Sequence, residues 1–200
     1  MSVEISGRYE FMQLAKIRPA TPEDYASIRA LHKATIGSVG WRFYSQAEVT
    51  AKLEEIDRPD YTAAMLKENV QLVTLGDVLL GSSAWRPSNE HPQTATITHL
   101  YVHPLFTNGG VATALIEENE QLAYKSGFRW ISALSDFNSR SFFTRLGYEA
   151  KGFRGYKITR TTQYPLQIMT RHISTQYAQS ARKRSINKPQ LIGQSVAHHS

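Results

Sequence analysis

ITHLYVHPLFTNGGVATAL, residues 97–115, joins an apolar segment with strand character to a helical pattern through a turn that holds two glycines. Such a junction aims free backbone N–H groups at one point, with the positive end of a helix behind them. An anion is stable at such a point, and a pyrophosphate fits it best. The same pattern also occurs in turns that are no more than tight connections, so taken alone it is a weak signal.

An amphipathic helix is predicted directly after this junction. Val111, Leu115 and Leu122 lie on one apolar stripe of helical spacing, and Gly127 ends the pattern. The acidic residues of this helix are expected on its solvent face, namely Glu117, Glu118 and Glu120.

Beyond this helix, the pattern predicts further strands over residues 129–134, 148–158 and 163–173. Asp136 or Asn138 can cap a short helix after the first of these strands, and Gly147 closes that helix. A parallel strand that follows a helix implies a right-handed crossover.

Upstream of the glycine turn, apolar and β-branched residues predict three antiparallel strands over residues 70–75, 78–85 and 94–102. Gly76-Asp77 is a two-residue hairpin signal between the first two strands. Thr21-Pro22-Glu23-Asp24 is a strong helix start, and Ser45-Gln46-Ala47-Glu48 matches a capping box that opens a second helix.

This order of elements predicts a mixed α/β (α+β) fold. We expect a single central, mostly antiparallel sheet with one parallel βαβ crossover, flanked by helices. We divide the 200 residues into an N-terminal extension over residues 1–13, one domain over residues 14–173 and a basic, flexible C-terminal tail over residues 174–200.

The composition excludes several classes of protein. The chain has no cysteine, so it forms no disulfide and has neither a thiolate metal site nor a cysteine nucleophile. No group of His, Asp and Glu has the spacing of metal ligands, and we predict no metal. Because we find no signal peptide pattern and no apolar run of the roughly 18 residues that a membrane span needs, we expect a soluble, cytoplasmic protein without a membrane partner.

The net charge of +6 is unevenly distributed. Four of these charges belong to the tail, which has no acidic residue: Arg182, Lys183, Arg184 and Lys188. Residues 1–173 therefore carry only +2, which is too little to argue for nucleic-acid binding. A basic tail can bind nucleic acid, a membrane surface or an acidic partner, but a solvated terminus explains it as well.

Two motifs at matching distances resemble those of the GNAT superfamily of N-acetyltransferases. Leu100-Tyr101-Val102-His103-Pro104, followed by Thr107-Asn108-Gly109-Gly110-Val111-Ala112, is similar to motif A of that family, in which a strand precedes Gln/Arg-x-x-Gly-x-Gly/Ala. Asn138-Ser139-Arg140-Ser141-Phe142-Phe143-Thr144-Arg145-Leu146-Gly147-Tyr148 is similar to motif B in loose form. The resemblance covers residues 16 to 173 and is far stronger than either glycine pair alone.

The resemblance implies that acetyl-coenzyme A is the cofactor. Backbone N–H groups of residues 108–113 would hold its pyrophosphate, which approaches without a Cβ clash at Gly110. The backbone of Leu100 and Val102 would pair with the pantetheine arm like an added strand. The full set of implied cofactor-binding residues is Leu100, Tyr101, Val102, Thr107, Asn108, Gly109, Gly110, Val111, Ala112, Thr113, Asn138, Phe142 and Arg145.

The chain departs from the family pattern at three places. Thr107 replaces the Gln or Arg of motif A, which removes one phosphate contact. Phe143 stands where many members have a tyrosine that acts as the general acid. Thr96 and Thr98 stand where many members have a glutamate that acts as the base.

Four residues are candidates to replace the missing acid and base. His99 lies beside the reactive strand and titrates near neutral pH, although strand alternation can also place it on the opposite face. Ser135, at the end of the following strand, can relay a proton near the sulfur or act as a capping hydroxyl. Tyr148 and Tyr101 can donate to the thiolate or serve in packing.

The resemblance also implies that the acceptor pocket is built by the first two helices, their connecting loop and the last strands. Six aromatic residues fall there and predict a partly apolar pocket or lid, unless they fill the core: Trp41, Phe43, Tyr44, Trp85, Tyr156 and Tyr164. Glu54 and Glu55 can attract a cationic amine, although exposed helix acids are common.

We therefore predict an acetyl-CoA-dependent N-acetyltransferase that acts on a primary amine of a small molecule or peptide, by direct attack on the thioester. One rival is a non-catalytic acyl-CoA-binding or regulatory protein of the same fold. Another is an acetyltransferase of a nucleic-acid-associated protein, for which the tail is the sole argument. The acceptor amine and the oligomeric state, including a homodimer, stay open.

Overall fold

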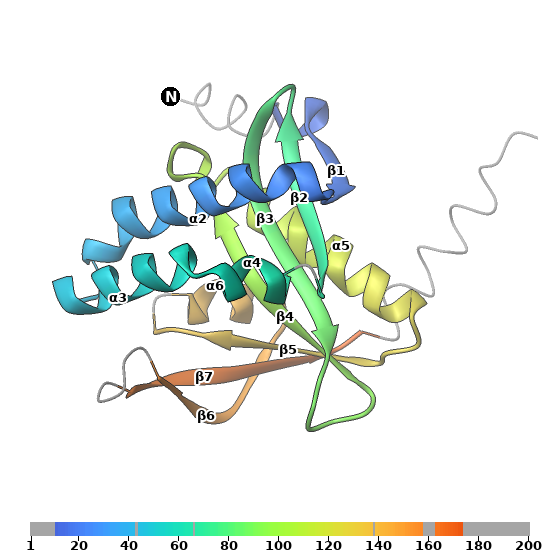
Figure 1. The fold of residues 1–200 in the computed structure, drawn as a ribbon. Coiled ribbons are helices and arrows are strands. Elements are labelled where there is room, and N and C mark those ends of the chain that lie inside the picture. The colour runs from blue at the N-terminus through green and yellow to red at the C-terminus, as the bar shows by residue number, and fades with distance from the viewer. Residues whose placement is uncertain (1–10, 43, 66, 138, 158–162, 174–200) are drawn as a thin grey trace, which may run out of the picture.

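The computed structural model describes residues 11–42, 44–65, 67–137, 139–157 and 163–173. Its centre is a seven-stranded sheet in the order β1-β2-β3-β4-β5-β7-β6. In chain order the strands are β1 (Lys16–Pro19), β2 (Asn69–Leu75), β3 (Val78–Pro87), β4 (Thr94–Val102), β5 (Trp130–Ser135), β6 (Glu149–Lys157) and β7 (Gln163–His172). Figure 1 shows that the sheet is strongly twisted, so that β5, β6 and β7 run across the direction of β2 and β3.

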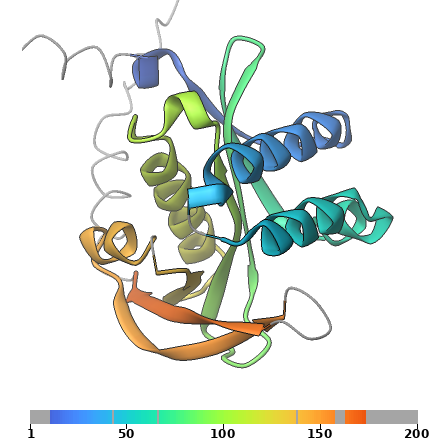
Figure 2. The same ribbon diagram turned by 90° about the vertical axis from the view of Figure 1, so that its left-hand side faces the viewer.

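Helices cover both faces of this sheet (Figure 2). The helices are α2 (Tyr25–Val39), α3 (Gln46–Asp57), α4 (Pro59–Met65), α5 (Val111–Lys125) and α6 (Arg140–Arg145). Short 3-10 turns lie at residues 22–24, 40–42 and 104–106. The apolar sides of α2 and α4 pack on β2 and β3 from one face, and α5 packs on the opposite face.

All strand pairs are antiparallel except β4 and β5, which pair in parallel through the α5 crossover. This confirms the predicted mixed α/β fold with its one parallel crossover. The hairpin at Gly76-Asp77 also forms as predicted, and Gly76 adopts φ +56°.

The helix starts follow the predicted capping chemistry. Ser45 accepts a hydrogen bond from the N–H of Glu48, whose carboxylate accepts in return from the N–H of Ser45. At the start of the first helix, the Asp24 carboxylate accepts from the N–H of Thr21 and pairs with Arg18 at 2.7 Å. The Arg18 guanidinium lowers the pKa of Asp24 well below its usual range.

Glu120 is a correction to the sequence analysis, which placed it on the solvent face of α5. Its side chain is fully buried, because it lies on the same helical stripe as Ile116 and Ala123. The Tyr148 hydroxyl donates to its carboxylate at 2.7 Å, and the Arg171 guanidinium donates to it at 3.2 Å. These two partners make burial of the carboxylate tolerable.

The last residues of the predicted N-terminal extension pack on the domain. Phe11 lies edge-on to Phe106 with ring centroids 5.4 Å apart, and Phe11 and Met12 join the apolar cluster around the start of α5. Within the described part of the chain, no helix has the length and apolar character required to cross a membrane.

Candidate active site

The glycine turn forms the N-terminus of α5. Gly110 is the N-cap residue with φ +88°, a left-handed conformation that side chains other than glycine rarely adopt. Asn108 is also left-handed, with φ +61°, and asparagine tolerates this better than most residues. The first N–H groups of α5 have no acceptor within the helix, so the turn offers donors and the positive helix end to one anion.

Two other residues of the turn, Gly109 and Thr107, make contacts within the protein. Gly109 is buried, and a Cβ there would lie 2.7 Å from the Phe11 ring, so this glycine is required by packing. The Thr107 hydroxyl donates to the carbonyl of Pro104 at 3.1 Å.

The sheet opens beside this turn. The parallel pairing of β4 with β5 ends at Ile97 and Ala133, and residues 98–102 continue against β3 alone. The N–H of His103 donates to the carbonyl of Leu80 on β3. Because backbone groups alternate along a strand, those of Leu100 and Val102 face the opposite, open edge. This edge can take an extended ligand as an added strand.

A β-bulge interrupts β4 where the sheet opens. Ser82 pairs with Tyr101 and Ala84 pairs with Thr98, so Ser83 alone faces both His99 and Leu100. His99 adopts φ +50° there. As a result, Thr98 and His99, although adjacent, both reach the carboxylate of Glu68 and lie on the same face of the sheet. The bulge thus overrides strand alternation and turns His99 toward α2 and α4.

Glu68 is a residue that the sequence analysis missed. Its side chain is 11% exposed, and its Oε2 atom lies 3.7 Å from Nε2 of His99. The Thr98 hydroxyl donates to the same carboxylate, and Arg86 Nε lies 3.3 Å from Oε1. Burial lowers the pKa of His99, whereas the negative charges of Glu68 and Glu55 oppose this effect. A neutral imidazole beside a carboxylate can act as a general base, because it can accept a proton.

His32 and Tyr61 form the wall behind His99. The fully buried His32 lies 2.5 Å from the Tyr61 hydroxyl through Nδ1 and 2.8 Å from the Ser82 hydroxyl through Nε2. Its ring stacks on Tyr101 with centroids 3.9 Å apart, and the Tyr61 ring lies edge-on to His99 at 5.5 Å. Burial lowers the pKa of His32, so it is neutral at ordinary pH.

Neither His32 nor Tyr61 was expected to belong to the site. A signal for His32 existed in the sequence, because it is a lone polar residue on the apolar stripe of Ile28, Leu31 and Ile36. Tyr61 lies in α4, and no pattern in the sequence singled it out.

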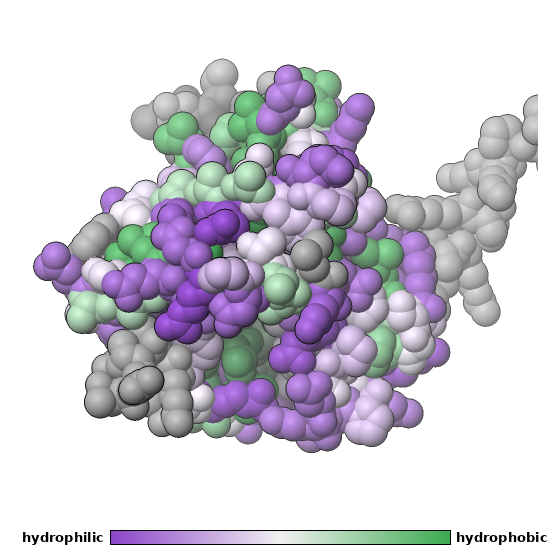
Figure 3. Space-filling model, viewed as in Figure 1, coloured by the Kyte–Doolittle hydropathy of each residue, from purple (hydrophilic) through white to green (hydrophobic). Residues whose placement is uncertain are grey.

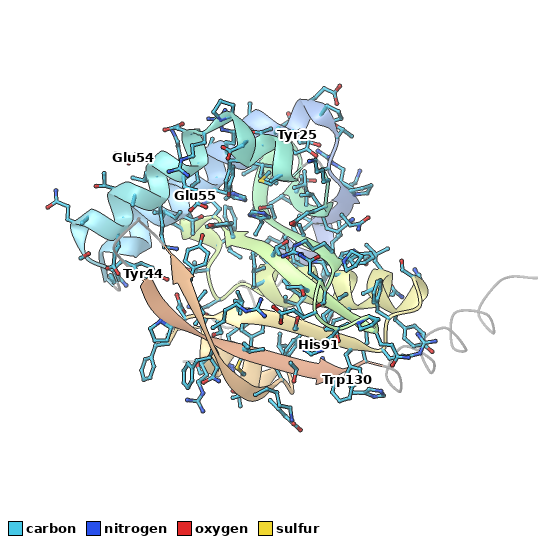
Figure 4. The ribbon with its side chains drawn as sticks, turned by 60° about the horizontal axis from the view of Figure 1, so that its bottom comes forward. Tyr25, Tyr44, Glu54, Glu55, His91 and Trp130 are labelled. Atoms are coloured by element: carbon cyan, nitrogen blue, oxygen red, sulfur yellow. The ribbon has the colours of Figure 1, made fainter. Side chains whose placement is uncertain are left out.

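The outer wall comes from α3 and the end of β6. The Tyr156 hydroxyl donates to the Glu55 carboxylate at 3.3 Å, and Lys52 Nζ lies 5.4 Å from the centre of the Tyr156 ring. Figure 4 shows Glu55 and Tyr44 at this end of the molecule. In Figure 3 the surface over α3 is mostly hydrophilic, and apolar residues lie recessed below it.

The predicted aromatic residues separate into two groups. Tyr44 and Tyr156 lie at this outer wall, whereas Trp85 is buried on the α5 face and packs edge-on to Phe128. Phe43 and the side chains of Trp41 and Tyr164 lie outside the described residues.

Across the opening from β4, a chain of hydrogen bonds begins at the end of β5. The buried Ser135 hydroxyl lies 2.9 Å from the Ser139 hydroxyl, which donates to Asp136 at 2.7 Å. The other oxygen of Asp136 accepts from the Tyr44 hydroxyl at 2.5 Å. Asp136 also accepts from the N–H of Ser139 in the turn before α6, whereas the N-cap residue of α6 is Ser139 and not the predicted Asp136 or Asn138.

Two further predicted site residues, Tyr148 and Phe142, lie on the α5 side of the sheet. Tyr148 is buried in the core, and its hydroxyl is bonded to Glu120. Phe142 is half-buried against Phe143, and Arg145 is exposed. Asn138 lies outside the described residues.

Two other observations delimit the site. An open hollow lies at the opposite end of the sheet, lined by His91, Pro92, Gln93, Thr94 and Trp130. Figure 4 shows His91 and Trp130 far from Tyr44, so this hollow is separate from the bulge. In the part of the chain that the structure describes, no three His, Asp or Glu side chains are grouped to hold a metal ion.

The fold of this chain, with its sheet that opens beside the start of α5, is similar to that of solved acetyltransferase structures. A GCN5-related N-acetyltransferase from Rhodopseudomonas palustris is 27% identical, with a TM-score of 0.69 over 78% of this chain and 94% of that one. PaiA N-acetyltransferase from Thermoplasma acidophilum, in complex with coenzyme A, is 15% identical, with a TM-score of 0.65 over 79% and 98%.

A third structure, yncA from Salmonella typhimurium with its cofactor acetyl-CoA, is 18% identical, with a TM-score of 0.57 over 81% of this chain and 95% of that one. Among curated proteins, none matches this sequence significantly.

The family model for GNAT acetyltransferases matches residues 30–148. The chain belongs to the acetyltransferase (GNAT) family. Acetyl-CoA is the cofactor of this family, and the geometry here fits it: Gly110 leaves the start of α5 uncovered by a Cβ, and an unpaired strand edge leads from there to the bulge.

Proposed function

We propose that this chain transfers the acetyl group of acetyl-CoA to a primary amine of a small molecule or a peptide. The observation that carries the proposal is the position of His99. The bulge turns its imidazole toward Glu68 at the point where the sheet opens, so a base stands beside the open edge.

His99 is proposed to take the proton from the acceptor amine. Burial keeps its imidazole neutral near physiological pH, as a base must be. When the imidazole gains a proton, the Glu68 carboxylate stabilises the positive charge. Thr98 and Arg86 hold that carboxylate in place, so Glu68 acts through His99.

Backbone groups are proposed to bind the cofactor. Acetyl-CoA supplies the thioester from which the acetyl group is transferred. The α5 turn, residues 107–113, binds the pyrophosphate, and the edge of Leu100, Tyr101 and Val102 binds the pantetheine arm. An N–H of Leu100 or Val102 polarises the carbonyl, because both face the open edge. Phe142, Arg145 and Asn138 are proposed to line the far side of the cofactor.

Ser135 is proposed to return a proton to the departing thiolate. It ends β5, where its hydroxyl donates to the Asp136 carbonyl and lies within hydrogen-bond distance of the Ser139 hydroxyl. Ser139 and Tyr44 both donate to the Asp136 carboxylate, which connects Ser135 to the outer wall of the acceptor side. We do not assign this role to Tyr148, because its hydroxyl is buried on the α5 side and donates to Glu120.

The acceptor is proposed to enter between α3 and the end of β6, beside Tyr156 and Glu55. Tyr156, Tyr61 and Tyr101 supply apolar ring faces, and Glu55 and Glu68 attract a cationic amine. Such a wall suits an amine on an apolar or extended body. The expected cytoplasmic location agrees with acetyl-CoA as the cofactor and stays a proposal.

The test uses the purified full-length chain. We expect one-to-one binding of acetyl-CoA by calorimetry, and release of free thiol when a panel of small amines and lysine peptides is added. His99→Gln should bind the cofactor as the wild type does but lose most of its turnover. Binding without turnover of any amine would favour the non-catalytic rival. No binding at millimolar acetyl-CoA would overturn the proposal.

A further inference from the structure

Two consecutive serines of β3 stand opposite the bulge of β4. Ser82 and Ser83 are both buried, with 1% and 0% of their surface exposed. Because neighbouring strand residues point to opposite faces, their hydroxyls reach helices on the two sides of the sheet. A buried hydroxyl needs a hydrogen-bond partner, and each of these has one on a helix.

On the face that carries α2, the Ser82 hydroxyl lies 2.8 Å from Nε2 of His32. The other ring nitrogen of His32 lies 2.5 Å from the Tyr61 hydroxyl. The His32 ring is nearly parallel to that of His99, with centroids 6.1 Å apart. Ser82 therefore fixes the ring against which the candidate base lies.

On the face that carries α5, the Ser83 hydroxyl accepts from Nδ2 of Asn119 at 2.8 Å. Asn119 is fully buried. The same hydroxyl points at the carbonyl of Thr98, the residue that precedes His99, at 3.4 Å. Ser83 thus links α5, which begins at the proposed pyrophosphate turn, to the backbone of the bulge.

The bulge needs such support. His99 is not a glycine but has φ +50°, and a non-glycine residue keeps this strained left-handed conformation only where its surroundings hold it there. The β-ladder does not hold it, because Ser83 faces two residues and cannot pair with both. The side chains around the bulge must therefore supply the constraint.

We propose that Ser82 with His32 and Ser83 with Asn119 form a clamp through the sheet, and that this clamp positions the bulge for acetyl transfer. The four residues are positioning residues, because they act through His99 and the β4 backbone. The inference rests on the proposed function, because that function assigns to the bulge both the base and the N–H that polarises the carbonyl.

The test compares Ser82→Ala and Ser83→Ala with the wild type. Each should lower kcat about tenfold or more, because the base and the carbonyl donor lose their alignment. The dissociation constant of acetyl-CoA should change far less than kcat, since the pyrophosphate turn is untouched. Amide hydrogen exchange at His99 and Leu100 should become faster, and this readout does not depend on activity.

Ser132→Ala is the matched control. Ser132 also makes a strand hydroxyl bond, 3.1 Å to Thr96, but in the regularly paired part of the sheet. Its kcat should stay within about twofold of the wild type. Ser83→Thr keeps the hydroxyl and should recover most of the kcat lost in Ser83→Ala.

If Ser83→Ala does not fold, Ser83→Ala combined with Asn119→Leu replaces both partners by apolar groups and leaves no orphaned amide donor. Unchanged kcat and unchanged exchange at His99 in the folded variants would overturn the clamp. A wild type that turns over no amine would instead overturn the proposed function, and the exchange measurement would still decide on the clamp.

Discussion

Gly110 is a residue where both the backbone conformation and the proposed cofactor site require the absence of a side chain. Its φ of +88° disfavours any side chain, and a β-carbon would stand where the pyrophosphate is proposed to lie. Gly110→Val should abolish acetyl-CoA binding in calorimetry while circular dichroism shows a folded domain.

Gly127 offers the matched control at the other end of α5. It has φ +96°, and a Cβ at this position would meet open space, so Gly127→Val carries a similar backbone strain without a clash. This variant should lose stability but keep its acetyl-CoA affinity. Cofactor binding by Gly110→Val would show that the phosphate site lies elsewhere.

His99 sets the expected pH dependence of turnover. Because the imidazole must be neutral to accept a proton, kcat/KM should rise with pH through a midpoint below 6.5, in line with the lowered pKa. Glu68 favours the charged imidazole, so Glu68→Gln should move the midpoint further down. Steady-state rates from about pH 5 to 8 measure both, and a profile that His99→Gln leaves unchanged would remove His99 from the mechanism.

The sequence predicted some site residues and missed others for a physical reason. Gly110 and His99 belong to a continuous motif, so local spacing was enough to find them. Glu68 and Tyr61 reach His99 only because a bulge reverses its side chain, and no pattern in β4 announces a bulge. The proposed role of the Ser82 and Ser83 hydroxyls depends on the same bulge, so the sequence alone did not indicate it.

At the scale of elements, α5 is tied to β7 by a buried ion pair. Arg171→Met would leave the Glu120 carboxylate buried without its cation, and should cost about 3–5 kcal/mol of unfolding free energy. Tyr148→Phe removes one hydrogen bond to the same carboxylate and should cost about 1–2 kcal/mol. Urea denaturation measures both losses.

The Tyr148→Phe variant should also keep its kcat within about twofold, since the hydroxyl is committed to Glu120. A tenfold loss of kcat with normal cofactor binding would return Tyr148 to the mechanism as a proton donor.

Capping residues, the glycine hairpin and the apolar periods predicted the order of helices and strands, because each is a local signal. The solvent face of α5 was wrong at Glu120, since charge alone suggested exposure. Its partners, Tyr148 and Arg171, lie 28 and 51 residues away in sequence, so no local pattern shows that they meet it.

The whole molecule should lose stability in mild acid. Unfolded His32 takes up a proton as the pH falls through about 6.5, whereas the buried ring resists protonation. Stability is therefore full above that pH and decreases below it, by up to about 1.4 kcal/mol per pH unit for each such group. His99, whose pKa is also lowered, adds to this slope.

His32→Gln should reduce the slope between about pH 6.5 and 5, although it lowers stability at about pH 8. Chemical denaturation at several pH values measures the slope. An equal slope in both proteins would show that His32 is not the group responsible.

The sheet also separates the proposed acceptor-binding wall from the proposed cofactor-binding turn. The wall proposed to meet the acceptor comes from α3, α4 and the end of β6, whereas the turn proposed to hold the cofactor begins α5 on the other face of the sheet from α4. Residues on one face can therefore change without disturbing the other, with the bulge as the shared part. Directed evolution for a new amine should concentrate its accepted changes on α3 and α4 and leave the β3–β4 bulge untouched.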